Sequence, residues 1–399
     1  MKYGYQFNRL ELAGSLGDLG TLLPIAMGMI LINGLDPLGL FFSIGVFYIL
    51  TGVYFGITVP VQPMKVIGAY SIAASLSAAE IQASGILIAL FLLVIGVTGA
   101  ITLIGKYIPK EVVRGIQMST GVLLMVQGVR LMMGTSQFQL LQKAAEPYLT
   151  IQTLGPIPIG IIIGVCGGLA TLLLLENKKL PAGLCVILGG LAIGLLIGAH
   201  EGFDKMKIGI YLPTFLPFGL PTNADFTFAL LALVIPQTPM TLGNAVIAYS
   251  DLSAEYYGSA SRKVTYRSAC ISMALGNIIS FLFGGMPLCH GAGGLAAHYR
   301  FGARSTGSNI IIGVIFLVMA LLLGTSVIAI AYLIPMAILG ILLIFAGSQL
   351  ALTILDIWNR KQLFVAFMMM GITLASNLAV AFMVGVLLAY ILKSEAMKI

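Results

Sequence analysis

Long apolar runs follow one another along almost the whole chain, from Leu12 to Leu392. Hydrophobic residues make up 59% of the sequence and charged residues only 9%, whereas a soluble domain usually carries about 25% charged residues. A helix needs roughly 20 apolar residues to cross the hydrocarbon of a bilayer. The sequence therefore predicts an all-α integral membrane protein that has the lipid bilayer as its solvent.

Polar and Gly/Pro breaks divide the apolar sequence into about fourteen expected transmembrane segments. Their approximate limits are 12–32, 38–58, 63–79, 84–105, 111–133, 157–176, 181–199, 226–250, 266–284, 289–301, 307–325, 327–355, 362–376 and 378–392. If the first segment runs outward, most of the 21 lysines and arginines fall in loops on one side. Because cytoplasmic loops are enriched in Lys and Arg, we expect an even number of spans with both termini in the cytoplasm.

An internal repeat links the two halves of the chain. The stretch FGITVPVQPMKVIGA (55–69) matches FGGMPLCHGAGGLAA (283–297) in its Phe-Gly start, its proline, its polar break and its small residues. The first stretch opens the third segment, which runs outward, and the second opens the tenth, which runs inward. Matching Gly/Pro-interrupted segments in an inverted repeat are the best sequence pointer to a transporter's binding site.

The prolines in this repeat predict two half-helices. Pro60 and Pro63 have no N–H and bias the preceding residues to extended structure, so the third helix starts late. The tenth segment holds about ten helical residues before Arg300, which is roughly half the hydrocarbon thickness. Both helices would then start near the midplane, each presenting about +0.5 of a charge. With a protonated Lys65 nearby the total approaches about +2, which suits a dianion.

Several polar residues near these breaks are candidates for the site, and each has a structural alternative. Lys65 would bind the anion or snorkel to the cytoplasmic surface. Gln62 would donate to an oxyanion or cap the broken helix. His290 would be a ligand donor, a proton carrier or a hydrogen-bonded cap, and the glycines from Gly291 to Gly293 would let the backbone approach an anion.

Further candidates lie in the first and eighth segments. Asp18 would carry a coupled proton, cap the first helix, or pair with Lys65 when the site is empty. Gln237, Thr241 and Asn244 supply neutral groups inside the eighth segment. These three would contact substrate or form hydrogen bonds between helices.

We find no pattern for catalysis, a resident metal, a cofactor or nucleic acid. The three histidines, at 200, 290 and 298, lack metal-ligand spacing, and the four cysteines are scattered through apolar segments. GAGGLA (291–296) has the form of a dinucleotide fingerprint, but no soluble βαβ unit surrounds it. The net charge of +7 sits in loops between spans. We therefore expect a protein that is not an enzyme.

Four ordered blocks closely resemble the signatures of the molybdate transporter family, a branch of the sulfate permease superfamily. They are GDLGTLLP (17–24), VPVQPMK (59–65), IPQTPMTLGNAVIA (235–248) and MPLCHGAGGLAAHYRFGAR (286–304). Because the blocks fall in both halves, the resemblance covers essentially the whole chain. Sulfate permeases usually end in a cytosolic STAS domain, which we do not expect here, as in the molybdate branch.

The resemblance implies seven plus seven inverted spans, divided into a core domain and a gate domain. The core would hold 1–110 and 222–325, and the gate 111–221 and 326–399. Substrate would bind between the third and tenth spans, move by an elevator-type mechanism, and be imported with protons through a homodimer in the inner (plasma) membrane. Many relatives carry a carboxylate in the eighth span where our alignment places Asn244, so the residue that couples the proton is left open.

The expected site combines both lines of reasoning. The predicted substrate-binding residues are Gln62, Pro63, Met64, Lys65, Gln237, Thr241, Asn244, His290, Gly291, Ala292 and Gly293, and the proton-coupling candidates are Asp18 and His290. The expected substrate is molybdate, with tungstate as a further oxyanion. The alternatives are a carrier of sulfate or another small anion in the same superfamily, and a nucleobase–proton symporter of the same architecture. A channel is the other class that the sequence leaves open.

Overall fold

The computed structural model describes residues 4–101, 109–177, 180–198 and 207–393. This part of the chain is mostly helical, and a helix lies in every apolar segment predicted from the sequence. In chain order the elements are α1 (Arg9–Ser15), α2 (Leu19–Leu31), α3 (Pro37–Phe55), β1 (Gln62–Pro63), α4 (Lys65–Ala74), α5 (Ala78–Thr98), α7 (Lys110–Met133), α8 (Gln137–Gln142), β2 (Thr153–Leu154), β3 (Ile157–Pro158), α9 (Ile159–Leu174), α10 (Ala182–Ile197), α11 (Asn223–Ala229), η1 (Leu230–Val234), α12 (Ile235–Met240), η2 (Thr241–Ala248), α13 (Tyr249–Tyr257), η3 (Gly258–Ser261), α14 (Tyr266–Leu282), β4 (Leu288–Cys289), α15 (Ala292–Arg300), α16 (Thr306–Leu323), η4 (Gly324–Ser326), α17 (Val327–Tyr332), α18 (Met336–Ala351), η5 (Leu352–Asp356), α19 (Arg360–Ala375) and α20 (Leu378–Ile391).

Six of the described helical runs are long and apolar enough to cross a membrane, or seven if the bent pair α1 and α2 forms one span. The longest is a continuous run, Asn223–Ser261, that includes two π-helical stretches. Both chain ends, for which we expect a cytoplasmic location, lie outside the described residues. The four cysteines are free thiols; Cys270 and Cys289 are buried, Cys185 is partly buried and Cys166 is exposed.

Local sequence explains why α3 delivers the chain to the first break. Asp36 caps its N-terminus by accepting a hydrogen bond from the Gly39 N–H at 2.9 Å, and Pro37 occupies the first helical position. Gly56 ends the helix with φ 75°, a left-handed conformation that glycine adopts without steric cost. The chain then leaves the helix as an extended segment.

The two breaks of the repeat meet in space as a short antiparallel pair. Gln62 of β1 lies opposite Cys289 of β4, and Pro63 lies opposite Leu288. The Met64 N–H donates to the Pro287 carbonyl at 2.9 Å and extends the pair by one bond. Helices α4 and α15 start directly after these strands, so the pairing fixes where both N-termini lie.

Buried amide side chains satisfy much of the extended backbone. Asn309 of α16 accepts from the Val59 N–H and donates to the Val59 carbonyl, both at 2.8 Å. Asn277 of α14 does the same for Leu288, at 2.9 and 2.8 Å. Both asparagines are fully buried. Because backbone groups inside a membrane need partners within the protein, these side chains are a condition for the breaks to exist.

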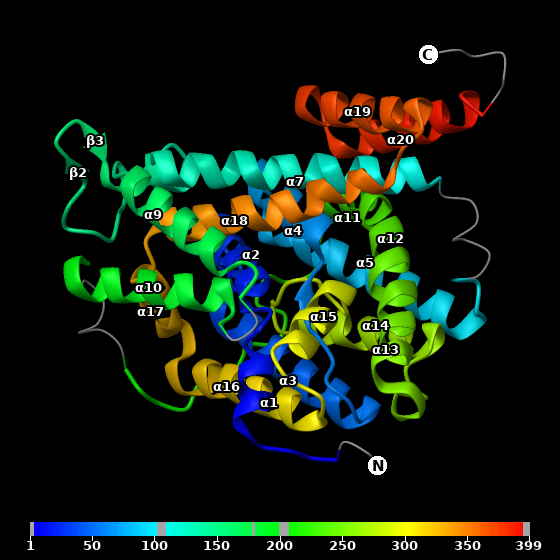
Figure 1. The fold of residues 1–399 in the computed structure, drawn as a ribbon, viewed down its shortest axis with the longest axis horizontal. Helices are drawn as coiled ribbons and strands as arrows, with labels where there is room; N and C mark the ends of the chain where they lie inside the picture. The colour runs from blue at the N-terminus through cyan, green and yellow to red at the C-terminus, as the bar shows by residue number, and fades with distance from the viewer. Residues whose placement is uncertain (1–3, 102–108, 178–179, 199–206, 394–399) are drawn as a thin grey trace.

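Close helix pairs surround the breaks (Figure 1). Helix α3 packs against α16, and α14 packs against α5. Helix α7 lies along α18, where Gly121 faces Gly347 and Gly128 faces Gly340. A Cβ on Gly128 would lie 2.4 Å from the Gly340 carbonyl oxygen. Small residues therefore set the short distance between α7 and α18.

Replacing Asn309 with Ala should destabilise the protein. The change leaves the buried N–H and C=O of Val59 without their side-chain partner, and each unsatisfied group costs about 1–3 kcal/mol. We expect a loss of at least about 2 kcal/mol, measured as a fall of several degrees in the melting temperature of the purified protein. The matched control is Asn223→Ala, at an exposed position. Equal melting temperatures of the Asn309→Ala and Asn223→Ala variants would contradict the role given to Asn309.

Candidate functional site

A cavity of about 500 Å³ lies next to the paired breaks. One wall comes from α2, α4, η2 and α15, and the opposite wall from α7, α9, α10 and α18. The polar and charged residues that line it are Asp18, Thr21, Gln62, Lys65, Gln117, Thr171, Asn244, Arg300, Gln349 and Thr353. At about 30 Å³ per water molecule, this volume holds a tetrahedral oxyanion together with on the order of ten waters.

Asp18 and Gln62 form a buried pair at the edge of this cavity. The Gln62 amide nitrogen Nε2 donates to both carboxylate oxygens of Asp18, at 2.8 and 2.7 Å. Asp18 precedes α2, but its side chain makes no capping hydrogen bond. The other polar atom of the Gln62 amide, Oε1, is buried and has no partner in the described structure. The pair is therefore only half satisfied.

Two glycines let α15 approach this pair. A Cβ on Gly291 would lie 1.7 Å from Gln62 Oε1, and a Cβ on Gly294 would lie 2.8 Å from an Asp18 carboxylate oxygen. Any larger residue would displace the Gln62 amide or the Asp18 carboxylate. The sequence predicts that the backbone from Gly291 to Gly293 can approach an anion; in the structure the neighbour of Gly291 is the Gln62 side chain.

Gln237 of α12 occupies the N-terminus of α4. Its Oε1 accepts from the N–H groups of Val66 and Ile67, at 3.0 and 3.1 Å, and its Nε2 donates to Thr241 Oγ1 at 2.9 Å. Both side chains are buried. Two of the free donors of the α4 N-terminus are therefore used by the protein itself, which corresponds to the interhelical alternative for Gln237. The bond of Thr241 to Gln237 lies within one helical run.

The N-terminus of α15 keeps its donors. In the parts of the chain that the structure describes, no protein acceptor lies on the N–H groups of Ala292, Gly293 or Gly294. Gly293 lines the cavity, and the space where its Cβ would lie is open. Free N–H groups at a helix start attract anions, because they also carry the positive end of the helix dipole.

The charges around the cavity are not balanced. Lys65 and Arg300 line it, whereas Asp18 is the one carboxylate among the described lining residues. Within the described residues neither cation forms an ion pair, since the ion pairs found there join Lys110 and Arg114 to Asp356. Lys65 is partly buried, so its charge acts in a medium that screens it less than bulk water does.

Asn244 adds a neutral donor to the same wall. It is partly buried, lines the cavity, and no protein hydrogen bond engages its amide within the described structure. Its Nδ2 lies 3.5 Å from where a Cβ on Gly291 would be, so it is adjacent to the start of α15. Asn244 thus lies beside the start of α15, and Lys65 lines the same cavity.

His290 lies behind the strand pair and does not line the cavity. Its Nδ1 is 2.9 Å from the Pro60 carbonyl, which can only accept, so Nδ1 carries a proton. Its Nε2 is 2.9 Å from Ser272 Oγ. The ring stacks on Phe47 at 4.9 Å and is fully buried. Both nitrogens therefore have protein partners in this structure, as the cap alternative for His290 requires.

The structure brings part of the predicted site together at the cavity, namely Asp18, Gln62, Lys65, Asn244 and Gly293. The remaining predicted residues, Pro63, Met64, Gln237, Thr241, His290, Gly291 and Ala292, surround the strand pair and the two helix starts without lining the cavity. In the described chain no group of three or more His, Cys, Asp or Glu side chains could hold a metal ion.

Sequence reasoning missed Arg300 as a site residue and used it only to mark the end of the tenth segment. It ends α15 and lines the cavity together with Gly293, Ala296 and Ala297. These positions recur three or four residues apart, so they lie on one face of the helix. That spacing was available in the sequence and would have placed Arg300 on the face that carries Gly293.

Solved structures share this fold. The transmembrane domain of the bicarbonate transporter BicA from a cyanobacterium matches 98% of this chain and 100% of its own, with a TM-score of 0.64 and 15% identity. Murine Slc26a9, an anion transporter solved in the inward-facing state, matches 98% of this chain and 69% of its own, with a TM-score of 0.66 and 14% identity. At these identities the likeness concerns the fold alone.

Sequence comparison is more specific. The family model described as "Molybdate transporter of MFS superfamily" matches residues 10–124 and 229–350. Molybdate transporter 2 of Arabidopsis thaliana is 32% identical over 96% of this chain and 87% of its own length. Molybdate transporter 1 of Chlamydomonas reinhardtii is 28% identical over 94% and 89%. The four blocks resembling the molybdate branch are thereby explained, and the chain belongs to the molybdate transporter family.

Proposed function

We propose that this protein imports molybdate together with protons by an elevator-type alternating-access mechanism. The observation that carries the proposal is the cavity wall that contains the Asn244 amide, the free N–H groups of α15 and Lys65, which forms no ion pair within the described residues. Asp18 is the one carboxylate among the described lining residues, and Gln62 Nε2 donates to both of its oxygens, so the positive charge and donors of this wall exceed the negative charge. We propose molybdate over other oxyanions because the similar proteins are named molybdate transporters.

In this proposal the oxyanion lies between the starts of the third and tenth spans, which are the half-helices α4 and α15. Lys65 and the α15 N–H groups neutralise its charge, and Gln62 and Asn244 donate to its oxygens. Gln237 orients α4 by holding its first turn, with Thr241 supporting it. Pro63, Met64, His290, Gly291 and Ala292 shape the site by fixing the strand pair and the helix starts.

The proposed architecture is the seven-plus-seven inverted repeat with a core (1–110, 222–325) and a gate (111–221, 326–399). The helix contacts support it: α3 packs on α16, and α14 packs on α5. Helices α3 and α16 lie in the second and eleventh predicted segments, and α14 and α5 lie in the ninth and fourth. The two pairs are therefore equivalent if the second half of the chain repeats the first seven segments. The cavity supports the division as well, because one of its walls belongs to the proposed core and the other to the proposed gate.

The elevator movement follows from this division. The residues proposed to hold the anion all belong to the core, so the core can move as one body past the gate and carry the anion with it. The homodimer, the plasma-membrane location and the cytoplasmic termini belong to the same proposal and rest on the resemblance and on the distribution of basic residues.

Proton coupling is assigned to Asp18 acting through Gln62. When Asp18 is ionised, both of its oxygens accept from Gln62 Nε2. A protonated Asp18 has an O–H to donate, and Gln62 Oε1 is an unused acceptor. Rotation of the amide would then bring Oε1 to Asp18 and place Nε2 where Oε1 now lies, beside Gly291 and near the Asn244 amide. Proton binding and oxyanion binding would thus favour the same orientation of Gln62.

Uptake of molybdate into proteoliposomes tests the function as a whole. We expect accumulation that an inward proton gradient stimulates and that excess sulfate does not abolish. Complete block by sulfate, with sulfate itself transported, would replace molybdate import by the alternative of a broader oxyanion carrier. Equilibration without accumulation under the gradient would instead indicate a channel.

Replacing Lys65 with Ala should weaken molybdate binding about 10- to 100-fold, because a hydrogen bond to a charged group contributes about 1.5–3 kcal/mol. Binding to the purified protein measures the effect directly. The control Lys207→Ala removes the same charge from an exposed position outside the cavity. If the two variants bind molybdate equally well, Lys65 does not contact the anion.

Replacing Asp18 with Asn should remove the response to pH while leaving molybdate transport down its own gradient. Asn keeps the shape of Asp but cannot take up a proton, so the inward proton gradient should no longer stimulate uptake. The control is Asp251→Asn at an exposed carboxylate. Stimulation equal to that of the unmodified protein would assign the coupling to another residue.

A further inference from the structure

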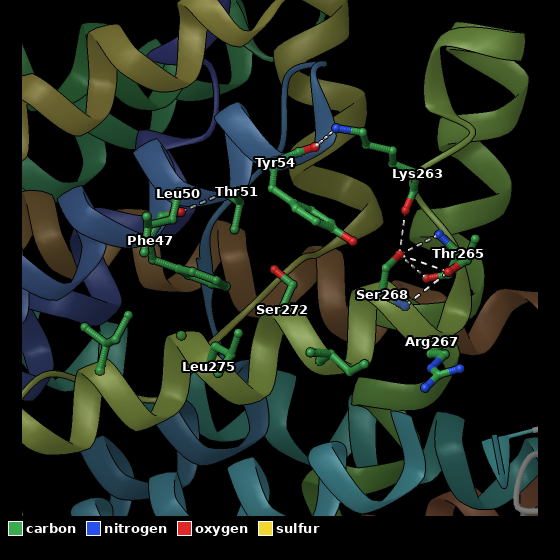
Figure 2. A pocket seen from close by; sticks show the side chains of 13 residues that line it. Phe47, Leu50, Thr51, Tyr54, Lys263, Thr265, Arg267, Ser268, Ser272 and Leu275 are labelled. Atoms are coloured by element: carbon green, nitrogen blue, oxygen red, sulfur yellow. Dashed lines mark hydrogen bonds between the residues drawn. The ribbon is translucent and has the colours of Figure 1, made fainter. Parts of the chain in front are cut away.

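A second hollow, of about 520 Å³, opens between α3 and α14 and shares no lining residue with the cavity (Figure 2). Most of its length is apolar. Leu50 on α3 faces Leu275 on α14, and these side chains are 52% and 53% exposed. The other apolar lining residues are Phe47, Ile271 and Ile279. In a membrane protein, exposed apolar side chains of this kind face hydrocarbon and not water.

One end of this groove is basic and polar. It is lined by Lys263, Thr265, Arg267 and Ser268, which lie where α14 begins. The Lys263 ammonium donates to the Tyr54 carbonyl at 2.9 Å and keeps two further donors. Arg267 is exposed, and within the described ranges it has no hydrogen bond or ion pair. No carboxylate lines the groove, so its basic end is complementary to an anion.

The length of the groove matches one leaflet of a bilayer. From Thr265 to Ile279 the chain rises 14 residues along α14, which is about 21 Å at 1.5 Å per residue. Half of the hydrocarbon core is about 15 Å, and the headgroup layer adds several ångströms. The basic end therefore falls at headgroup level when the apolar part lies beside the acyl chains.

We propose that this groove binds one anionic phospholipid. Its phosphate lies between Lys263 and Arg267. One acyl chain lies along Leu50 and Leu275. The groove is too small for a whole lipid, so the second chain stays in the bilayer. Basic side chains close to a membrane surface favour anionic headgroups over zwitterionic ones.

The test is native mass spectrometry of the full-length protein, with phosphatidylglycerol and phosphatidylcholine of identical acyl chains. We expect the unmodified protein to retain phosphatidylglycerol about tenfold better. Lys263→Ala combined with Arg267→Ala should abolish this preference. The matched control, Arg262→Ala with Arg360→Ala, removes two exposed charges that do not line the groove and should keep it.

A second variant tests the apolar part with both charges in place. Leu50→Trp fills the groove and should lower the retention of both lipids. Equal retention of the two lipids by the unmodified protein would overturn the proposal, as would equal losses in the two double variants. Displacement of the lipid by inorganic phosphate would also overturn the proposal. So would a dimer that contains no lipid and that Leu50→Trp dissociates, because a second copy of the chain would then occupy the groove.

Discussion

The structure depends on satisfying extended backbone inside a membrane protein. The segments before α4 and α15 run without helical hydrogen bonds through a buried region, where water is not available to replace them. Asn309 and Asn277 supply bidentate partners, and His290 supplies one more to the Pro60 carbonyl. Because the two segments also pair with each other, the starts of both helices are fixed relative to one another.

This support makes the two helix starts chemically different. At α4 the protein uses two backbone donors itself, through Gln237, and leaves the Lys65 side chain at the cavity. At α15 the glycines leave the backbone donors open and bring them against Gln62. One half of the repeat therefore offers a side-chain charge and the other offers backbone N–H groups. The two halves of the repeat therefore contribute different kinds of donor to one cavity.

The positions of the helices and the two breaks could be predicted from the sequence, because apolar runs, prolines and glycines act locally. The partners at the breaks could not. Gln237 and Val66 are 171 residues apart, and Asn309 and Val59 are 250 apart. No local pattern says that an amide in the eighth segment caps the third. Lys65, Gln62 and Asn244 were found because a polar residue in an apolar run is unusual, whereas Arg300 was overlooked because it stands at a segment end.

The orphan oxygen of Gln62 bears on how tightly proton and anion are linked. If protonation of Asp18 frees Gln62 Nε2 for the oxyanion, then the proton raises anion affinity, and the anion must raise proton affinity by the same factor. A hydrogen bond to a charged acceptor contributes about 1.5–3 kcal/mol, so this factor is about 10 to 100. One amide can thus couple the two ligands without any change in the backbone. Only glycine at positions 291 and 294 leaves room for that amide and for the Asp18 carboxylate, which gives these glycines a reason beyond helix packing.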